Sequence, residues 1–238
     1  MTWGNRRESS RDCATHWRKW LVGLSELDNS LANWCELGRS KRKAAEKKLD
    51  FHDLDEIERL LLSGRNRRDT DQSVIMELGF SLRLWNAMPE NESSQVFGTC
   101  GLFGSTPSIP LQNTAGLSLP IGGEALCRLS RFDTLLRLIS LGVSVWDPEY
   151  ATVSSSLPAR IDEGGSVKAG SAIWMHYFPV TGVAISDLPN NLRVEPVLDR
   201  GSLVVAVDGD FNIGDPRKME AASAAVELVK ATGLLESR

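Results

Sequence analysis

The sequence has few of the residue patterns that metal-dependent or nucleophilic enzymes use. Its three histidines, His16, His52 and His176, stand far apart, and neither an HExxH motif nor a His/Cys pair at zinc-ligand spacing is present. A GxSxG nucleophile elbow and a GxxxxGK[ST] phosphate-binding loop are also missing. We therefore expect no catalytic, cofactor or metal site, and no enzymatic activity.

Long apolar runs and a secretory cysteine pattern are missing as well. The longest apolar stretches are far shorter than the ~20 residues that a membrane-spanning helix needs, and no apolar stretch follows the basic residues of segment 1–7, as it would in a signal peptide. Cys13, Cys35, Cys100 and Cys127 are widely spaced and form no CxxC pair. The sequence thus predicts a cytoplasmic protein with free thiols and no membrane partner.

An excess of basic charge is also absent, because the formal net charge is −4. General nucleic-acid binding requires a basic surface, so a direct nucleic-acid partner is not expected. The charge is uneven: residues 1–85 carry 16 basic and 14 acidic side chains (+2), and residues 86–238 carry 11 and 17 (−6). The acidic part is the better place for a surface that attracts a basic partner, although mild acidity also serves solubility.

Hydrophobic spacing and capping residues predict several helices. These cover residues 10–27 after a cap at Ser9 or Ser10, then 40–49, 53–63 and 123–141, and a last one that starts at Pro216 after Asp215. Trp17 and Trp20 share the apolar face of the first helix, so we expect them in the core.

Apolar or alternating segments predict strands between and after these helices. They span residues 74–76, 78–85, 95–103, 115–119, 143–146, 172–180, 192–197 and 203–207. The stretch 151–170 is rich in small residues and is interpreted as a loop or weak helix and as a candidate hinge. The order of elements predicts an α+β fold with a mostly antiparallel sheet flanked by helices, built over 1–238 as one large domain or two intimate subdomains.

Two segments suggest a metal-dependent hydrolase or nuclease as an alternative function. Asp208 and Asp210 are spaced like calcium-loop ligands, but the glycine comes one position late and Met219 occupies the last ligand position. Glu46 precedes two lysines in a charged segment that is typical of a solvated helix face. A nuclease site of this type needs a carboxylate on a preceding strand, which the Glu46 segment does not offer. A strand-end turn that leads to the Asp215 cap explains the Asp208 and Asp210 segment better.

A basic run suggests a second alternative, a regulatory protein associated with nucleic acid. Arg65, Arg67 and Arg68 could contact phosphates. Asp69 and Asp71 follow them at once, which favours an internal salt-bridge and turn role.

Several specific segments match no catalytic pattern, yet occur in a recognisable order. They are Trp3–Ser9 (WGNRRES), Trp34 followed by Gly38–Ala44, Gly64–Asp69, Glu77–Asn86 and Trp146–Pro148. In order and spacing they resemble the immunity protein 52 family of bacterial polymorphic toxin systems, over about the first 150 residues. The chain departs from the family in one respect, since it begins almost at the Trp-Gly motif, where a longer preceding strand is expected.

The resemblance implies a non-enzymatic inhibitor that is encoded beside its toxin. For this family the toxin is typically a nuclease of restriction-endonuclease fold, often delivered between bacteria by a type VI secretion apparatus. The motifs themselves look structural, and the resemblance supplies no catalytic residues.

Electrostatics suggests how such an inhibitor would work. A nuclease holds DNA in a basic groove, and an acidic protein can compete for that groove. The candidate partner-binding carboxylates lie in the acidic part of the chain: Glu149, Asp162, Glu163, Asp208 and Asp210. Blocking toxin dimerisation or closure is an alternative. Exposed aromatic residues usually contribute most to such interfaces, but the sequence does not show which of the seven tryptophans reach the surface.

Overall fold

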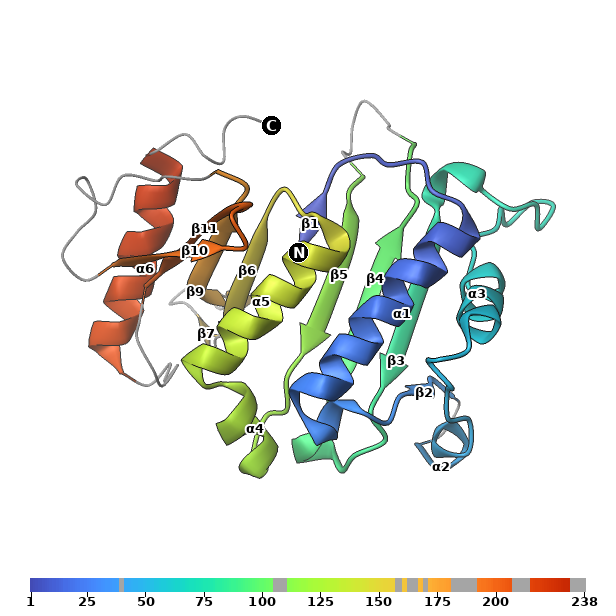
Figure 1. The fold of residues 1–238 in the computed structure, drawn as a ribbon, viewed down its shortest axis with the longest axis horizontal. Helices are drawn as coiled ribbons and strands as arrows, with labels where there is room; N and C mark the ends of the chain where they lie inside the picture. The colour runs from blue at the N-terminus through green and yellow to red at the C-terminus, as the bar shows by residue number, and fades with distance from the viewer. Residues whose placement is uncertain are drawn as a thin grey trace. The chain divides into compact units, whose positions relative to one another are not determined.

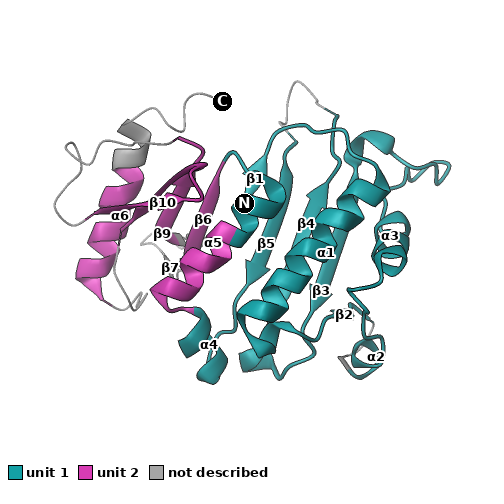
Figure 2. Cartoon of the chain, in the orientation of Figure 1, with its two compact units in different colours: residues 1–129, 141–149 teal, residues 130–140, 150–238 magenta. Residues whose placement is uncertain are grey.

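The computed structural model describes residues 1–38, 41–104, 111–156, 160–161, 167–168, 171–180, 192–206 and 215–231. The chain forms two compact units (Figure 2): unit 1 comprises Met1–Leu129 and Leu141–Glu149, and unit 2 comprises Ser130–Ser140 and Tyr150–Arg238. Each unit contains helices and an antiparallel sheet, which confirms the predicted α+β fold (Figure 1). The hinge at 151–170 stays a prediction.

Unit 1 is built on a five-stranded antiparallel sheet with the order β1-β5-β4-β3-β2. Its strands are β1 (Thr2–Trp3), β2 (Cys35–Glu36), β3 (Phe80–Trp85), β4 (Gln95–Cys100) and β5 (Asn113–Ser118). The central strands β3, β4 and β5 pair antiparallel in sequence order, which agrees with the predicted, mostly antiparallel sheet. The short strand β1 pairs with β5 and forms one edge of the sheet.

Local sequence signals explain the helices of unit 1. Helix α1 (Ser10–Leu27) begins with a capping box, in which Ser9 and Asp12 each accept from the other's backbone N–H. Helix α3 (Leu54–Ser63) begins at Asp53, whose carboxylate accepts from two backbone N–H groups of the first turn. Helix α2 (Lys41–Ala45) is shorter than the predicted 40–49, and α4 covers Gly123–Leu129. Three 3₁₀ helices cover Asn29–Leu31, Met76–Leu78 and Glu90–Glu92.

All seven tryptophans are buried, which answers the question that the sequence left open. Trp85 is the most exposed of them at 7%, and the others are at most 1% exposed. In unit 1, Trp3 stacks on Trp146 with 5.3 Å between ring centroids, and Trp17 meets the same ring edge-on at 5.1 Å. The tryptophans therefore stabilise the core.

The region predicted as one helix and a strand is a pair of helices. The predicted helix 123–141 ends early as α4, and helix α5 (Phe132–Trp146) follows after a break. The strand predicted at 143–146 is wrong, because these residues form the end of α5. The β-branched Val143 and Val145 favour a strand locally, but in the helix Val143 and Trp146 are buried at helical spacing with Ile139, and this burial decides the outcome.

Unit 2 contains a four-stranded antiparallel sheet with the order β10-β11-β9-β6. Its elements are β6 (Ala151–Ser156), β9 (Ser171–Phe178), β10 (Arg193–Val197), β11 (Gly201–Val205), the separate pair β7 (Arg160–Ile161) and β8 (Val167–Lys168), and helix α6 (Pro216–Ala231). The strand predicted at 203–207 is observed as β11, inside the sheet, and the predicted Asp215 cap before Pro216 is confirmed. The loop or weak helix predicted from residue 151 is wrong for β6, whose small residues pair with β9.

Within the described residues, no helix is both long enough and apolar enough to cross a membrane.

Candidate functional site

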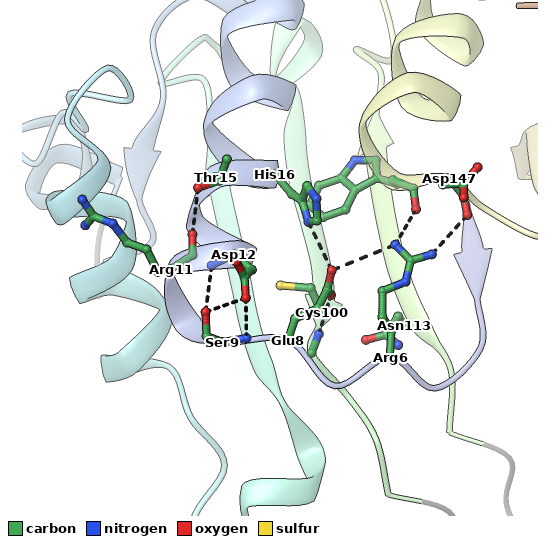
Figure 3. A network of polar contacts seen from close by, with 12 residues as sticks. Arg6, Glu8, Ser9, Arg11, Asp12, Thr15, His16, Cys100, Asn113 and Asp147 are labelled. Carbon is green, nitrogen blue, oxygen red and sulfur yellow. Dashed lines mark hydrogen bonds and ion pairs between the residues drawn. The ribbon is translucent and has the colours of Figure 1, made fainter.

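The first sequence motif holds the end of helix α5 in place (Figure 3). The Arg6 guanidinium donates hydrogen bonds to the carbonyl oxygens of Trp146 and Asp147, at 3.3 and 3.4 Å. These carbonyls lie where the helix leaves its acceptors unpaired and where the macrodipole attracts a cation. Asp147 itself has a φ of 46°, a left-handed conformation that ends the helix before Pro148. The motifs Trp3–Ser9 and Trp146–Pro148 are therefore in contact, and the first stabilises the helix end formed by the second.

Glu8 and His16 form the most enzyme-like pair in this network. The side chain of Glu8 is 9% exposed; one oxygen accepts from the Gly101 N–H at 3.3 Å, and the other lies 3.4 Å from His16 Nδ1 and 4.0 Å from Arg6. Burial lowers the pKa of His16, although Glu8 opposes this shift. Because the Glu8 oxygens already face backbone and side-chain donors, we interpret the pair as a link between motif segments.

Two buried asparagines complete the framework. The Asn113 amide donates to the Gly4 carbonyl at 2.7 Å and exchanges hydrogen bonds with the backbone of Leu102. Asn86, at the end of the Glu77–Asn86 motif, bonds to the backbone of Ser30 and Ser94 in the same manner. Each side chain pairs with main-chain groups of other segments, and the Leu102 carbonyl also accepts from the Arg6 N–H. Asn86 of the motif and Asn113, outside the motifs, thus hold segments of unit 1 together.

Only one of the five predicted partner-binding carboxylates falls in the described residues. Glu149 is exposed, but one of its oxygens accepts from the Gly4 N–H at 3.1 Å, and its own N–H donates to the Thr2 carbonyl. It therefore also ties the chain to β1. Asp162, Glu163, Asp208 and Asp210 lie outside the described residues.

The residues of the two alternative functions are not brought into a common site. Glu46 is exposed in the turn after α2, and Asp208 and Asp210 lie outside the described part of the chain. Where the structure is described, no three His, Cys, Asp or Glu side chains gather as metal ligands.

The basic run lies in and just before a small hairpin. Arg67 donates to the Gln72 carbonyl and pairs as a bridge with Val74, and Arg65 lies over the Phe80 ring at 5.0 Å. The backbone N–H of Arg68 donates to the Ser73 carbonyl. These contacts fit the turn role that the sequence favoured.

One face of the five-stranded sheet carries a surface that sequence reasoning missed. Residues whose side chains point to the opposite face, such as Leu84, Val96 and Ala115, are buried, and Figure 1 shows α1 in front of these strands. The alternate residues form what we call the uncovered face, and all but one of them are half-buried or exposed. They are Ser81, Arg83, Trp85, Gln95, Phe97, Thr99, Thr114, Gly116 and Ser118. The exception is Trp85, under the β2–α2 segment.

Strand register arranges the uncovered face in three rows. A hydroxyl row runs through Ser81, Thr99, Thr114 and Thr2, with 3.2 Å between the Ser81 and Thr99 oxygens. A central row aligns Arg83, Phe97 and Gly116. The third row is Trp85, Gln95 and Ser118. The alternation of polar and apolar residues in β3 and β4 was the available signal for this face.

A hollow of about 460 Å³ lies at the third row. Trp85 lines it together with Leu37, which is 50% exposed, and Ile121, which is 80% exposed. A second hollow, of about 480 Å³, lies over the other two rows between Arg83 and Thr114. The uncovered face and its hollows thus combine exposed apolar groups, hydroxyls, the cation Arg83 and the exposed carboxylate Glu90 in the lining of the first hollow, a composition suited to binding a protein surface.

Comparison with known proteins identifies the family. The family model described as Immunity protein 52 matches residues 1–238. No curated protein sequence matches the chain. The match extends the resemblance from the first 150 residues to all of them, and the chain therefore belongs to the immunity protein 52 family.

Proposed function

We propose that this protein binds and neutralises a toxin encoded beside it, and that it does so without catalysis. The observation that carries this proposal is the family match over the whole chain. The structure supports it in one respect. The motif side chains Arg6 and Glu8, together with Asn113, hold main-chain segments of unit 1 together, so they stabilise a surface and leave no reactive centre among themselves.

The partner in this proposal is a nuclease of restriction-endonuclease fold that a type VI secretion apparatus delivers into the cytoplasm. Such an enzyme needs a basic groove for DNA, and the −6 net charge of residues 86–238 attracts that groove. Glu149, Asp162, Glu163, Asp208 and Asp210 are the proposed electrostatic contacts. Occupying the active site or the DNA groove would then exclude the substrate.

Co-expression tests the function. The neighbouring reading frame is expressed alone and together with this chain. We expect growth arrest in the first case and normal growth in the second, and the Trp17→Ala variant, which disrupts the core, should protect poorly. A harmless neighbour, or arrest despite soluble wild-type protein, would overturn the proposal.

A purified assay tests the inhibitory mechanism. Titrating this protein into the toxin should abolish DNA cleavage at a one-to-one ratio, without consuming any substrate of its own. If acidic groups steer the encounter, the association rate should fall about tenfold or more between low and physiological salt. Glu149→Gln should slow association, whereas the exposed-site control Glu26→Gln on α1 should not.

A further inference from the structure

We propose that the toxin docks on the uncovered face of the five-stranded sheet, through a segment that presents a carboxylate to Arg83 and an apolar side chain to the hollow at Trp85. This inference rests on the proposed function and names the surface and the chemistry of its partner. It differs from a purely acidic interface because the central charge on this face is positive.

The polar residues alone do not identify this face as a binding surface, because an antiparallel sheet commonly carries polar residues on its solvated side. Its exposed apolar groups do. Leu37 and Ile121 flank the hollow at the third row, and Phe97 follows two residues after Gln95 on the same side of β4. Exposed large side chains scattered singly need no explanation, whereas Leu37 and Ile121 line one hollow and Phe97 lines the other on the same sheet face, an arrangement typical of a binding surface.

Phe97 has a structural role, but this role does not explain why much of its side chain is exposed. Its ring covers Gly116, where an added Cβ would come within 2.5 Å of the ring. The Arg83 guanidinium lies 5.9 Å from the ring centroid, yet Phe97 remains 36% exposed. An aromatic ring that is already fixed beside an arginine loses little side-chain entropy on binding. Arginine and aromatic residues are also enriched among the interface residues that contribute most binding energy.

Charge complementarity decides the kind of partner. Arg83 is the one charged side chain in the three rows, it is exposed, and it forms no ion pair with any described residue. A partner that covers it must supply a carboxylate, because burying an unpaired guanidinium is costly. A nucleic acid would need several cations for its phosphates, which this face does not provide.

A second copy of this chain is a weaker match for the same reason. In a two-fold symmetric pair, each uncovered face would meet its own equivalent. The three rows contain Arg83 but no carboxylate, and Glu90 lines the hollow at the third row, so a two-fold axis near Arg83 would bring two guanidinium groups together without a carboxylate between them. The hollow would also meet an identical hollow instead of a side chain that fills it.

Binding measurements with full-length variants test this inference. The affinity of the purified chain for the toxin is measured by calorimetry for the wild type, Arg83→Glu, Phe97→Ser and Ile121→Asp. We expect about 100-fold weaker binding for Arg83→Glu and at least tenfold weaker binding for the other two. The matched controls Lys19→Glu on α1 and Leu62→Ser on α3 should stay within about twofold, and thermal unfolding should verify that every variant folds.

The outcomes separate this inference from the function on which it rests. If the wild type binds the toxin and all three variants bind equally well, the docking surface is wrong, while the proposed function stands. If the wild type does not bind, both are overturned. If Phe97→Ser abolishes self-association of this chain and leaves toxin binding intact, the face joins copies of the chain, and the inference is again overturned.

Discussion

The two faces of the five-stranded sheet share their strands but differ in what their side chains do. On the covered face, Leu84, Val96 and Ala115 are at most 2% exposed and pack in the core of unit 1. On the uncovered face, Arg83, Phe97 and Thr114 alternate with them along the same strands. A change at one position therefore affects folding, and a change at the next position should affect binding.

The position of the polar groups sharpens this difference. Asn113, on the covered face, forms hydrogen bonds with the backbone of Gly4 and Leu102 in the same unit. Thr114, its neighbour in β5, belongs to the hydroxyl row of the opposite face. The polar group on the covered face stabilises the fold, whereas the opposite face, which includes Ser81 and Arg83 of the Glu77–Asn86 motif, remains available to a partner.

The largest loss in the free energy of unfolding should come from a substitution in the core behind the covered face. Trp17→Ala removes a fully buried ring, which should lower the free energy of unfolding by about 3–5 kcal/mol because a cavity remains. Phe97→Ala on the uncovered face should lower it by about 1 kcal/mol or less. Urea denaturation monitored by circular dichroism measures both. Equal losses would show that Phe97 also belongs to the core.

In unit 2, strand β9 differs from the strands of the five-stranded sheet because side chains on both of its faces are buried. In β9, His176 is buried with Nδ1 2.7 Å from the Tyr150 hydroxyl, and burial lowers its pKa to about 4. In the unfolded chain the pKa of His176 is near 6.5, so the unfolded state binds the proton more readily than the folded state. The stabilisation from neutral His176 is therefore complete above about pH 6.5 and is lost as the pH falls toward 4, by about 3 kcal/mol.

Unfolding measured across this pH range for the wild type and for His176→Gln tests the shift. The variant should lose most of the pH dependence between 6.5 and 4, because the amide keeps a hydrogen-bonding group beside Tyr150 but takes up no proton. An unchanged pH profile in the variant would assign the dependence to other groups.

A smaller difference in the free energy of unfolding should distinguish substitutions at two adjacent residues of β5. Asn113→Ala leaves the Gly4 carbonyl and both backbone groups of Leu102 without this partner, which should cost about 2 kcal/mol. Thr114→Ala, one position along the strand, should change the free energy of unfolding by no more than about 0.5 kcal/mol. Equal losses in thermal or urea unfolding would remove the distinction between the faces.

Local patterns allowed much of the fold to be predicted from the sequence. The cap at Ser9 and the helical spacing of Trp17 and Trp20 predicted α1, and the alternation in β3 predicted a half-buried strand. Predictions failed where tertiary contacts oppose local preference. Residues 143–146 are β-branched at alternate positions but complete α5, and the small residues of β6 form a strand because β9 pairs with them.

The candidate surface was harder to predict than the fold. Alternation shows that Arg83 and Phe97 share a face, but only the three-dimensional packing shows that α1 covers the other side. The sequence directed attention to carboxylates and tryptophans. The structure places all seven tryptophans in the core, and among the described residues the exposed aromatic side chain is that of Phe97, beside Gly116.

Cysteine footprinting tests most directly whether the uncovered face meets the partner. Thr99→Cys and, as a control on α3, Leu62→Cys are each introduced with Cys127→Ser, which removes the exposed native thiol. Alkylation rates are compared for the free chain and for the purified complex with the toxin. We predict that the complex slows alkylation at position 99 at least tenfold and leaves position 62 unchanged. Equal rates at position 99 in the free and bound chain would contradict the account.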